Sequence, residues 1–266
     1  MKILNTRMIK PVLHYFNLAD EVVSFSTTRH GGVSKGKLAT LNINPHRGDE
    51  PSAVAENLQA VAAEIGVEAD KIIRLHQIHE TRCLTVTDDF FRLSAAEQYE
   101  QEEGKDAVVT DCRNVCIGVH TADCVPVLFY DPVHHAIGAA HAGWRGTVQR
   151  IVQHTLRKMT ELYGTDPKEL KAVVGPCISL KNFEVGQEVY DAFSAAGFPM
   201  ERIARMYEKW HINLPLCNQL QLEELGVPAA NILQSGICTY DNASDFFSAR
   251  ILKEGFGTIY TGIALK

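Results

Sequence analysis

Short apolar runs, each bounded by turn residues, alternate along the chain with longer stretches of helical spacing. The short runs are rich in Val and Ile and are flanked by Gly, Pro, Asp or Asn, a pattern typical of β-strands. They predict strands at 22–29, 71–79, 82–88, 106–111, 114–124, 125–131, 136–143, 171–179, 231–238 and 257–264. Most of these segments follow one another without a helix between them. This order favours the α+β class over a regular doubly wound sheet.

Apolar residues at helical spacing mark the other elements. They predict helices at 48–66, 147–164, 185–197 and 213–226. In the first of these we expect Asp49 as the N-cap, Pro51 in the first turn and Gly66 at the C-terminal cap. The acidic segment 88–103 shows no clear period, and we interpret it as an irregular excursion on the surface.

Composition narrows the class of protein. The 266 residues are 45% hydrophobic, and no repeat or linker divides them, so we expect a single domain over 1–266. The net charge is −6 without a Lys/Arg cluster, which argues against nucleic-acid binding. No apolar run approaches the roughly 20 residues of a membrane helix, and the N-terminus lacks a signal-peptide core. Seven scattered cysteines then indicate reduced thiols in the cytoplasm rather than a disulfide framework.

Candidate metal ligands stand at the ends of predicted strands: His76 and His79 in "LHQIHE", Cys124 in "TADCVP" and His141 in "AAHAGWRG". Their spacings are too wide for a zinc finger and suit a site assembled from separate elements. Two imidazoles and a thiolate are good zinc ligands. Three protein ligands leave the fourth coordination position open for water or substrate, which is the catalytic pattern. The plainer alternative is a buried cysteine with surface histidines.

Polar and glycine residues around these positions favour a functional site. Asp123 beside Cys124 would need hydrogen-bond partners in a purely structural strand end. Gly143 and Gly146 permit close backbone approach, and Arg145 between them can present a planar fork to an anion.

Nine motifs then occur in one order across nearly the whole chain: "FSTTRHGGVS", "HQIH", "GKDAVVTD", "TADCVPVLFYDP", "AAHAGWRGT", "GPCIS", "FEVGQEV", "SGICTY" and "FFSARI". In this order they resemble the laccase-domain family, also called multicopper polyphenol oxidase or YfiH-type proteins and later reassigned as purine nucleoside phosphorylases. The resemblance implies an α/β/β/α sandwich with mixed sheets. It also implies a zinc site made by His79, Cys124 and His141.

The resemblance implies a reaction as well: phosphorolysis of adenosine, inosine, guanosine and methylthioadenosine, together with deamination of adenosine. Small-molecule purine nucleosides and phosphate would be the partners. Arg29, Arg145 and Arg250 lie in matching motifs and are candidates for binding phosphate. Gln77 is a candidate for contacting the base, or for capping backbone.

Other positions near these motifs have more than one reading. Asp123 is either the proton shuttle of the deamination or a partner that holds the site in place. His76 and Cys177 are interpreted as neighbours of the site rather than ligands. Phe256 stands where the family pattern leads us to expect an arginine, so any role of that arginine is in doubt here.

Three alternatives remain open. One is copper-dependent phenol oxidation at the same donors, although 11 histidines without a His-x-His pair do not suit several coppers. A second is a metal-free cysteine hydrolase with Cys124 as nucleophile and His141 as base, and cytoplasmic editing of peptidoglycan precursors would fit this or a zinc amidase. The third is a non-catalytic partner protein.

Overall fold

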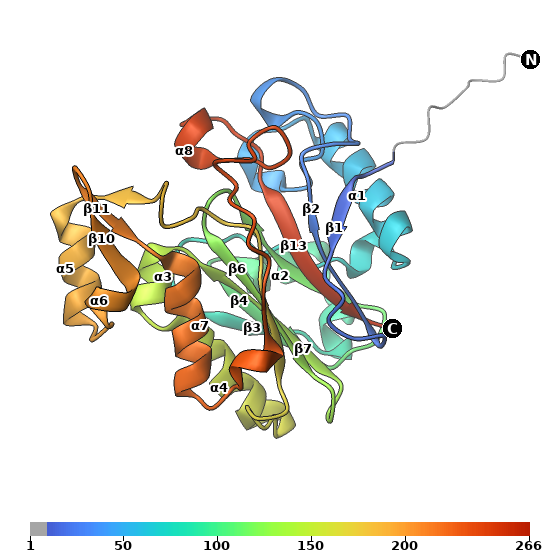
Figure 1. The fold of residues 1–266 in the computed structure, drawn as a ribbon. Helices are drawn as coiled ribbons and strands as arrows, with labels where there is room; N and C mark the ends of the chain where they lie inside the picture. The colour runs from blue at the N-terminus through green and yellow to red at the C-terminus, as the bar shows by residue number, and fades with distance from the viewer. Residues whose placement is uncertain (1–9) are drawn as a thin grey trace, which may run out of the picture.

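A computed structural model of the protein describes residues 10–266 (Figure 1). The N-terminal segment from which we argued against a signal peptide lies partly outside this range. The strands are β1 Leu13–Tyr15, β2 Val22–Thr27, β3 Cys83–Thr85, β4 Ala107–Thr110, β5 Cys116–Thr121, β6 Val125–Asp131, β7 Ala136–Ala142, β8 Lys171–Val174, β9 Glu184–Val185, β10 Ala204–Met206, β11 Trp210–Ile212, β12 Ile232–Gln234 and β13 Ile259–Leu265. The α-helices are α1 Pro51–Ile65, α2 Ala95–Glu102, α3 Trp144–Val148, α4 Ile151–Tyr163, α5 Gln187–Ala195, α6 Met200–Ile203, α7 Leu214–Glu224 and α8 Ala249–Leu252.

Two stacked sheets form the centre of the molecule. One has the strand order β12-β8-β6-β7-β4-β3 and mixes parallel with antiparallel pairs. The other has the order β1-β2-β13-β5 and is antiparallel throughout. Ile117 of β5 and Ile263 of β13 meet Leu128 of β6 and Ile137 of β7 in the apolar layer between the sheets.

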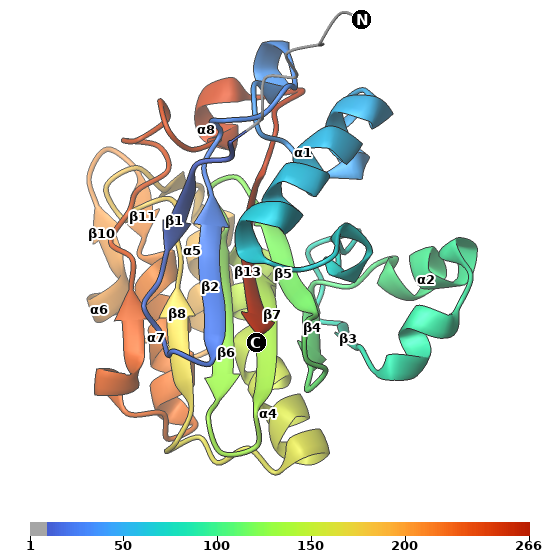
Figure 2. The ribbon, with the colours of Figure 1, turned by 90° about the vertical axis from the view of Figure 1, so that its right-hand side faces the viewer.

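Helices cover the two outer faces. Helix α1 packs through Leu58, Val61 and Ile65 onto the outer face of the four-stranded sheet, and Figure 2 shows it to the right of β2. Helices α4 and α7 cover the outer face of the six-stranded sheet. The predicted α+β class and the α/β/β/α sandwich with mixed sheets are therefore confirmed.

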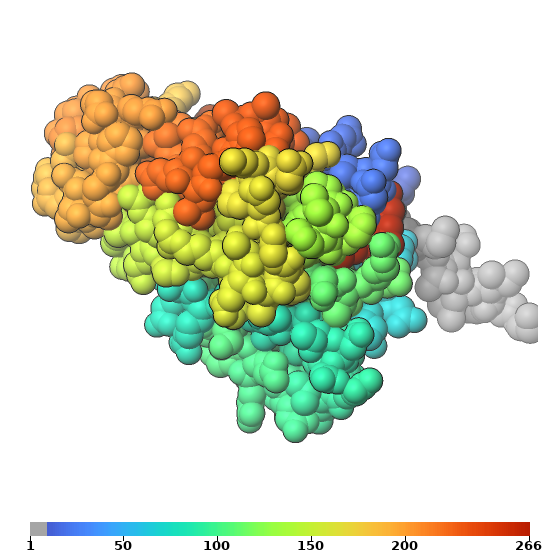
Figure 3. Space-filling model, turned by 90° about the horizontal axis from the view of Figure 1, so that it is seen from below, coloured from blue at the N-terminus to red at the C-terminus, as the bar shows by residue number. Residues whose placement is uncertain are grey.

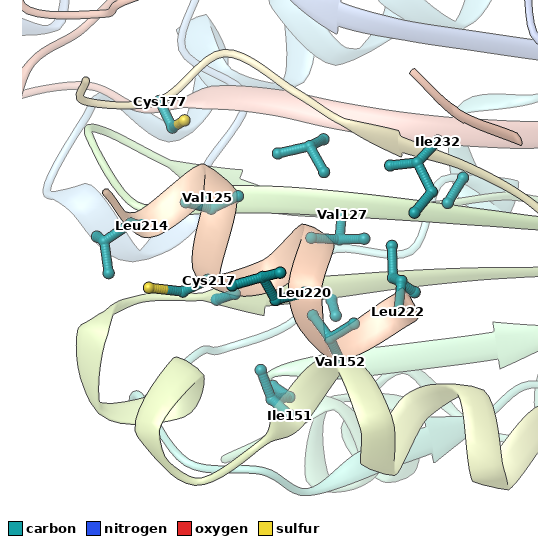
Figure 4. Packing of buried hydrophobic residues seen from close by; sticks show 14 of the residues in the cluster. Val125, Val127, Ile151, Val152, Cys177, Leu214, Cys217, Leu220, Leu222 and Ile232 are labelled. Atoms are coloured by element: carbon teal, nitrogen blue, oxygen red, sulfur yellow. The ribbon is translucent and has the colours of Figure 1, made fainter. Parts of the chain in front are cut away.

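Burial on both faces explains the unbroken apolar run of β6. Val125, Val127 and Phe129 face α4 and α7, whereas Leu128 and Tyr130 face the other sheet, because successive side chains of a strand point to opposite sides. Figure 4 shows Val125 and Val127 next to the apolar side chains of α7.

A small third sheet, β10-β11-β9, lies with α5 and α6 at one edge of the molecule. In Figure 3 these orange segments project at the upper left, and the turquoise to green part of the chain that includes α2 lies at the bottom. The sequence pattern did not predict this sheet, because its strands have only two or three residues each.

Several sequence predictions are wrong in detail. Segment 71–79 is no strand: Ile72, Ile73 and Leu75 are buried, but Ile78 is exposed, and the segment pairs only through single bridges at Ile72 and His76. Segment 88–103 is not irregular, since it forms a 3-10 helix at Asp88–Arg92 and then α2. The predicted helix 147–164 is divided into α3 and α4 by Arg150, whose φ is 63°.

At the first helix one cap is confirmed and one is wrong. The N-cap of α1 is Glu50 rather than Asp49, whose carboxylate accepts hydrogen bonds from Ser34 and Asn42 instead. Gly66 does form the C-cap, with φ 75°. Within residues 10–266, no helix is long and apolar enough to cross a membrane.

Candidate metal centre

Three elements of the six-stranded sheet bring the predicted ligands together at one edge. Cys124 lies in the short turn from β5 into β6, and His141 lies in β7, the antiparallel neighbour of β6. The register pairs Pro126 with His141, so Cys124, just before β6, lies at the C-terminal end of β7. His79 reaches the same edge from the loop that precedes β3.

The ligand atoms of His79, Cys124 and His141 all lie within 4.8 Å of one another. The Sγ atom of Cys124 is 4.0 Å from Nε2 of His79, and the two imidazole rings meet edge to face at 4.7 Å. His141 is buried, Cys124 is partly buried and His79 is exposed. The trio thus forms a cluster that is closed behind and open in front.

Asp106, just before β4, organises two of the three ligands. Its Oδ1 accepts hydrogen bonds from Nδ1 of His141 at 2.7 Å and from the backbone N–H of His79 at 3.0 Å. Its Oδ2 accepts the N–H groups of Ile78 and Glu80 at 3.1 and 2.9 Å. A histidine that is held through Nδ1 presents Nε2 to a metal ion. A carboxylate such as Asp106 is a usual hydrogen-bond partner for the other nitrogen of a metal-binding imidazole.

Strained backbone positions two of the ligands. His79 has φ 66° and Asp123, directly before Cys124, has φ 81°, values that residues other than glycine rarely adopt. Asp106 holds the first turn through three successive N–H groups. Asp123 holds the second through hydrogen bonds from Thr239 Oγ1, Ser248 Oγ and the backbone N–H of Arg250. Strain of this kind concentrates at functional sites.

The charges of Cys124 and His141 are coupled. Burial raises the pKa of the Cys124 thiol, but the charge of His141 and hydrogen bonds from both imidazoles outweigh burial and lower that pKa to about 6. Burial likewise lowers the pKa of His141, but the Cys124 thiolate and Asp106 outweigh it and raise that pKa. The thiolate, which is the form that binds metals, is therefore favoured near neutral pH.

The donor set fits a metal ion with an affinity for nitrogen and sulfur. Two imidazoles and one thiolate leave a fourth coordination position open. Asp106 supplies the carboxylate that commonly orients a metal-binding histidine, here His141. Gly143 closes the space behind the cluster: a Cβ there would lie 3.0 Å from His79 Cδ2 and 3.1 Å from Cys124 Sγ. The protein backbone is thus fitted closely around the ligands.

A cavity of about 250 Å³ opens in front of the trio. Besides the three candidate ligands, the residues that border it come from the 44–47 turn, the 75–77 loop, the end of β5 with Ala122, the start of α8 at Ala249, and the 256–258 segment. Gln77 lies at this cavity, but its amide is engaged with backbone: Nε2 donates to His120 O and Oε1 accepts the His120 N–H.

The arginines chosen from the sequence lie elsewhere. Arg29 is tied to the carbonyls of Ala39 and Ala243, the exposed Arg145 lies over the Trp144 ring, and Arg250 donates to Glu184 O. Of the described residues, the cavity border includes none of these three arginines and not Asp123.

Sequence reasoning missed Arg47, which does border the cavity. Its guanidinium lies 4.3 Å from the centre of the Phe256 ring, and its Nε donates to Phe256 O at 3.0 Å. Phe256, which stands where the family pattern has an arginine, therefore packs against a different arginine, Arg47. The sequence could not predict this contact, because the two residues lie far apart along the chain.

The neighbours His76 and Cys177 lie outside the ligand cluster. Nδ1 of His76 pairs with Glu103 at 2.6 Å, and its ring stacks on His46. Cys177 is buried in the apolar layer below the sheet edge, and Figure 4 shows it near Val125 and Leu214.

An α/β/β/α sandwich with a His/Cys/His cluster at the edge of its larger sheet defines the class of protein. The model of the family described as multi-copper polyphenol oxidoreductase laccase matches residues 23–266, and the chain belongs to this family. The resemblance stated from the motifs is confirmed.

Relatives match over nearly the whole chain. The chain is 41% identical to a protein of Bacteroides thetaiotaomicron named purine nucleoside phosphorylase, over 96% of this chain and 97% of that one. It is 35% identical to a protein named adenosine deaminase RL5 from an unknown prokaryotic organism, over 96% and 98%. Its fold matches the crystal structure of the Bacillus licheniformis hypothetical protein YfiH with a TM-score of 0.89, at 31% identity and 98% coverage of both chains.

Proposed function

We propose that this protein is a zinc-dependent purine nucleoside phosphorylase that also deaminates adenosine. The observation that carries the proposal is the near-full-length similarity to relatives named for these two activities. The cluster of His79, Cys124 and His141 at an open cavity supports it, because both reactions gain from a Lewis acid beside the substrate. The substrates would be purine nucleosides, with phosphate as the second substrate of phosphorolysis.

In the proposed phosphorolysis an oxygen of phosphate forms a bond to C1′ of the ribose, and the C1′–N9 bond breaks toward the purine. A zinc ion in the trio would supply a positive charge that polarises oxygen ligands or acidifies a bound water. The chain's own residues provide the setting. Asp106 fixes the His141 ring, and the turns at His79 and Asp123 hold the donors at one point.

Asp123 is proposed as a residue that holds the site rather than one that moves a proton. Its carboxylate is buried, and three donors from Thr239, Ser248 and Arg250 occupy its oxygens. A carboxylate held in this way positions the turn before Cys124 but does not face the cavity border.

Two features support zinc in a reducing compartment. Among residues 10–266 a single cluster of His, Cys or carboxylate groups is arranged to hold a metal, which suits one ion better than the several coppers of a multicopper oxidase. All seven cysteines, each within the described range, are free thiols. We therefore propose a cytoplasmic protein, with copper as the alternative ion at the same donors.

The reaction is tested by incubating the zinc-loaded protein with adenosine, with and without inorganic phosphate, and separating the products. Adenine and ribose 1-phosphate should form only with phosphate, whereas inosine should form in both cases. Release of adenine without phosphate would instead make the protein a nucleoside hydrolase. Failure to convert any purine nucleoside would reject the proposal.

One observation favours a second candidate, a metal-free cysteine hydrolase. The Cys124 Sγ atom lies beside two imidazoles and is held as a thiolate, which is the arrangement of a cysteine nucleophile with its base. A strong chelator separates the two candidates. Zinc chemistry is lost when the chelator removes the metal, whereas a cysteine hydrolase keeps its activity.

A further inference from the structure

The cavity in front of the metal trio has a wall made of hydrogen-bond donors. Of the described residues that border the cavity, none is Asp or Glu. The bordering residues do include His46, Arg47, His76 and His120. Arg47 forms no ion pair within the described chain, and its only recorded bond uses Nε, so both Nη groups are free to donate. A guanidinium fork without a carboxylate partner suits an oxyanion.

Two buried polar atoms of this wall have no partner. Nε2 of His120 and Oγ1 of Thr121 are both buried and make no hydrogen bond, although their residues border the cavity. His120 is 4% exposed and Thr121 is 2% exposed. Unpaired buried polar atoms are costly, so Nε2 of His120, in a residue that borders the cavity, indicates a ligand that satisfies it.

A chain of hydrogen bonds fixes which nitrogen of His120 carries the proton. The backbone N–H of His46 donates to Asn44 Oδ1, which turns the Asn44 amide so that Nδ2 donates to Thr258 Oγ1 at 3.2 Å. The Thr258 hydroxyl then has its hydrogen free for Nδ1 of His120, 3.4 Å away. Because Nδ1 accepts in this chain, Nε2 carries the hydrogen and is an unpaired donor in a residue that borders the cavity.

The surrounding charge favours the same ligand. Burial and then the positive charges of Arg74, His46, His141 and Arg47 lower the pKa of His120 well below its usual value, so its ring is neutral. A neutral imidazole has one N–H, so with Nδ1 as an acceptor, His120 donates a single hydrogen bond from Nε2. The edge of a purine offers donors and acceptors together, but donors under positive charge match an anion, most of whose oxygens accept hydrogen bonds.

We propose that Arg47 and His120 form an oxyanion subsite beside the metal trio, which binds inorganic phosphate. Thr258 is a positioning residue that acts through His120. This inference rests on the proposed function for the use of that phosphate as the nucleophile of phosphorolysis. It replaces Arg29, Arg145 and Arg250 as the groups expected to bind phosphate.

The test measures binding of inorganic phosphate to the zinc-loaded full chain by calorimetry, and KM for phosphate in phosphorolysis. Arg47→Gln should weaken phosphate binding by about 10–100-fold, the range expected for hydrogen bonds to a charged group. Zinc content should stay at the wild-type level, and phosphorolysis should fall by a larger factor than adenosine deamination, which uses water instead of phosphate. Arg150→Gln is the matched control, since Arg150 also stacks on a phenyl ring and bonds a backbone carbonyl but lies away from the cavity.

A second pair of variants tests the hydrogen-bond chain. Thr258→Val keeps the shape of the side chain but removes the hydroxyl, so it should raise KM for phosphate several-fold with little change in kcat. Thr258→Ser should restore the wild-type KM. A purely packing role would give the opposite order, because serine lacks the methyl group that valine keeps.

The outcomes separate this inference from the proposed function. Phosphate binding that depends on Arg47 in a protein without purine turnover would reject the proposed function and keep the subsite. Phosphorolysis with an unchanged KM for phosphate in Arg47→Gln would reject the subsite and keep the function. No phosphate binding to the wild type, or an equal loss of deamination and phosphorolysis in Arg47→Gln, would also overturn the subsite.

Discussion

Asp106 determines the geometry of the metal trio although it is not a ligand. Its buried carboxylate fixes the His141 ring through Nδ1 and holds the left-handed turn at His79 through backbone N–H groups. Burial raises its pKa, but the hydrogen bonds and charge of His141 and the backbone donors outweigh burial and lower it, so the group is ionised. One side chain therefore aligns two ligands that come from different elements.

Asp106→Asn tests this role. The amide NH₂ would replace one acceptor oxygen and face either His141 or the N–H groups of the 78–80 turn. We expect zinc affinity to fall by about 10–100-fold, as for other residues that orient metal-binding histidines, and stability to fall by about 1–3 kcal/mol. Competition with a chromogenic chelator measures the first and urea unfolding the second. Unchanged zinc affinity would show that Asp106 supports only the fold.

At the residue scale the sequence predicted the three residues that the structure brings together, but not the residues that support them. His79, Cys124 and His141 could be found because each is a metal-binding side chain near the end of an apolar run. Asp106 looked like any polar residue before a strand, although the strand pairing places it beside His141. Arg47 lies in a turn before α1, and only the folded chain brings it to Phe256 and the cavity.

At the scale of elements, the α2 region carries the clearest pH dependence. Glu102, the last residue of α2, lies near Arg74. Burial raises the pKa of Glu102 to about 7, although Arg74 opposes this shift. A folded-state pKa above the unfolded value means that the folded chain holds the proton more tightly. Stability from this group is thus present below about pH 4.5 and is lost as the pH rises toward 7.

Glu102→Gln should remove that loss. The variant should be more stable than the wild type at pH 8 by about 1–2 kcal/mol once screening by solvent is allowed for, and the difference should vanish near pH 4. Urea unfolding at both pH values measures it. Glu100→Gln, at an exposed position of the same helix, is the control and should behave like the wild type. A constant difference between Glu102→Gln and wild type at all pH values would contradict the assignment.

The strands that the sequence predicted well are those in which every residue is buried. Strands β5, β6 and β7 are apolar on both faces, so their runs are long and unambiguous. Segment 71–79 also contains buried apolar residues, and Ile73 and Leu75 pack in the layer between the sheets, but it meets β5 only through a single bridge at Ile72. Composition indicates burial in such a segment, whereas strand formation depends on a partner that lies elsewhere in the chain.

At the scale of the whole molecule, the layers share their apolar contacts. The six-stranded sheet packs on helices with one face and on the four-stranded sheet with the other, so no layer has a core of its own. We propose that residues 10–266 fold as one domain and unfold in a single cooperative transition. Tryptophan fluorescence and far-ultraviolet circular dichroism should give coincident urea curves. Separate midpoints would indicate two domains.

Leu222→Ala in α7 extends this test. Leu222 is fully buried in the layer that joins α7 to β6, as Figure 4 shows, and its truncation should cost about 2–5 kcal/mol. If the molecule is one cooperative unit, both spectroscopic curves should shift together to lower urea. A shift in only one curve would mean that the layers unfold separately.

The central claim is that His79, Cys124 and His141 hold the zinc ion on which purine phosphorolysis depends. The most direct test measures metal content and phosphate-dependent release of hypoxanthine from inosine on the same samples of wild type and Cys124→Ala. Cys177→Ala, a buried thiol outside the cluster, is the control. We predict one zinc per chain with phosphorolysis in the wild type and the control, and the loss of both together in a folded Cys124→Ala protein. A folded Cys124→Ala protein that keeps either its zinc or its phosphorolysis would contradict the claim.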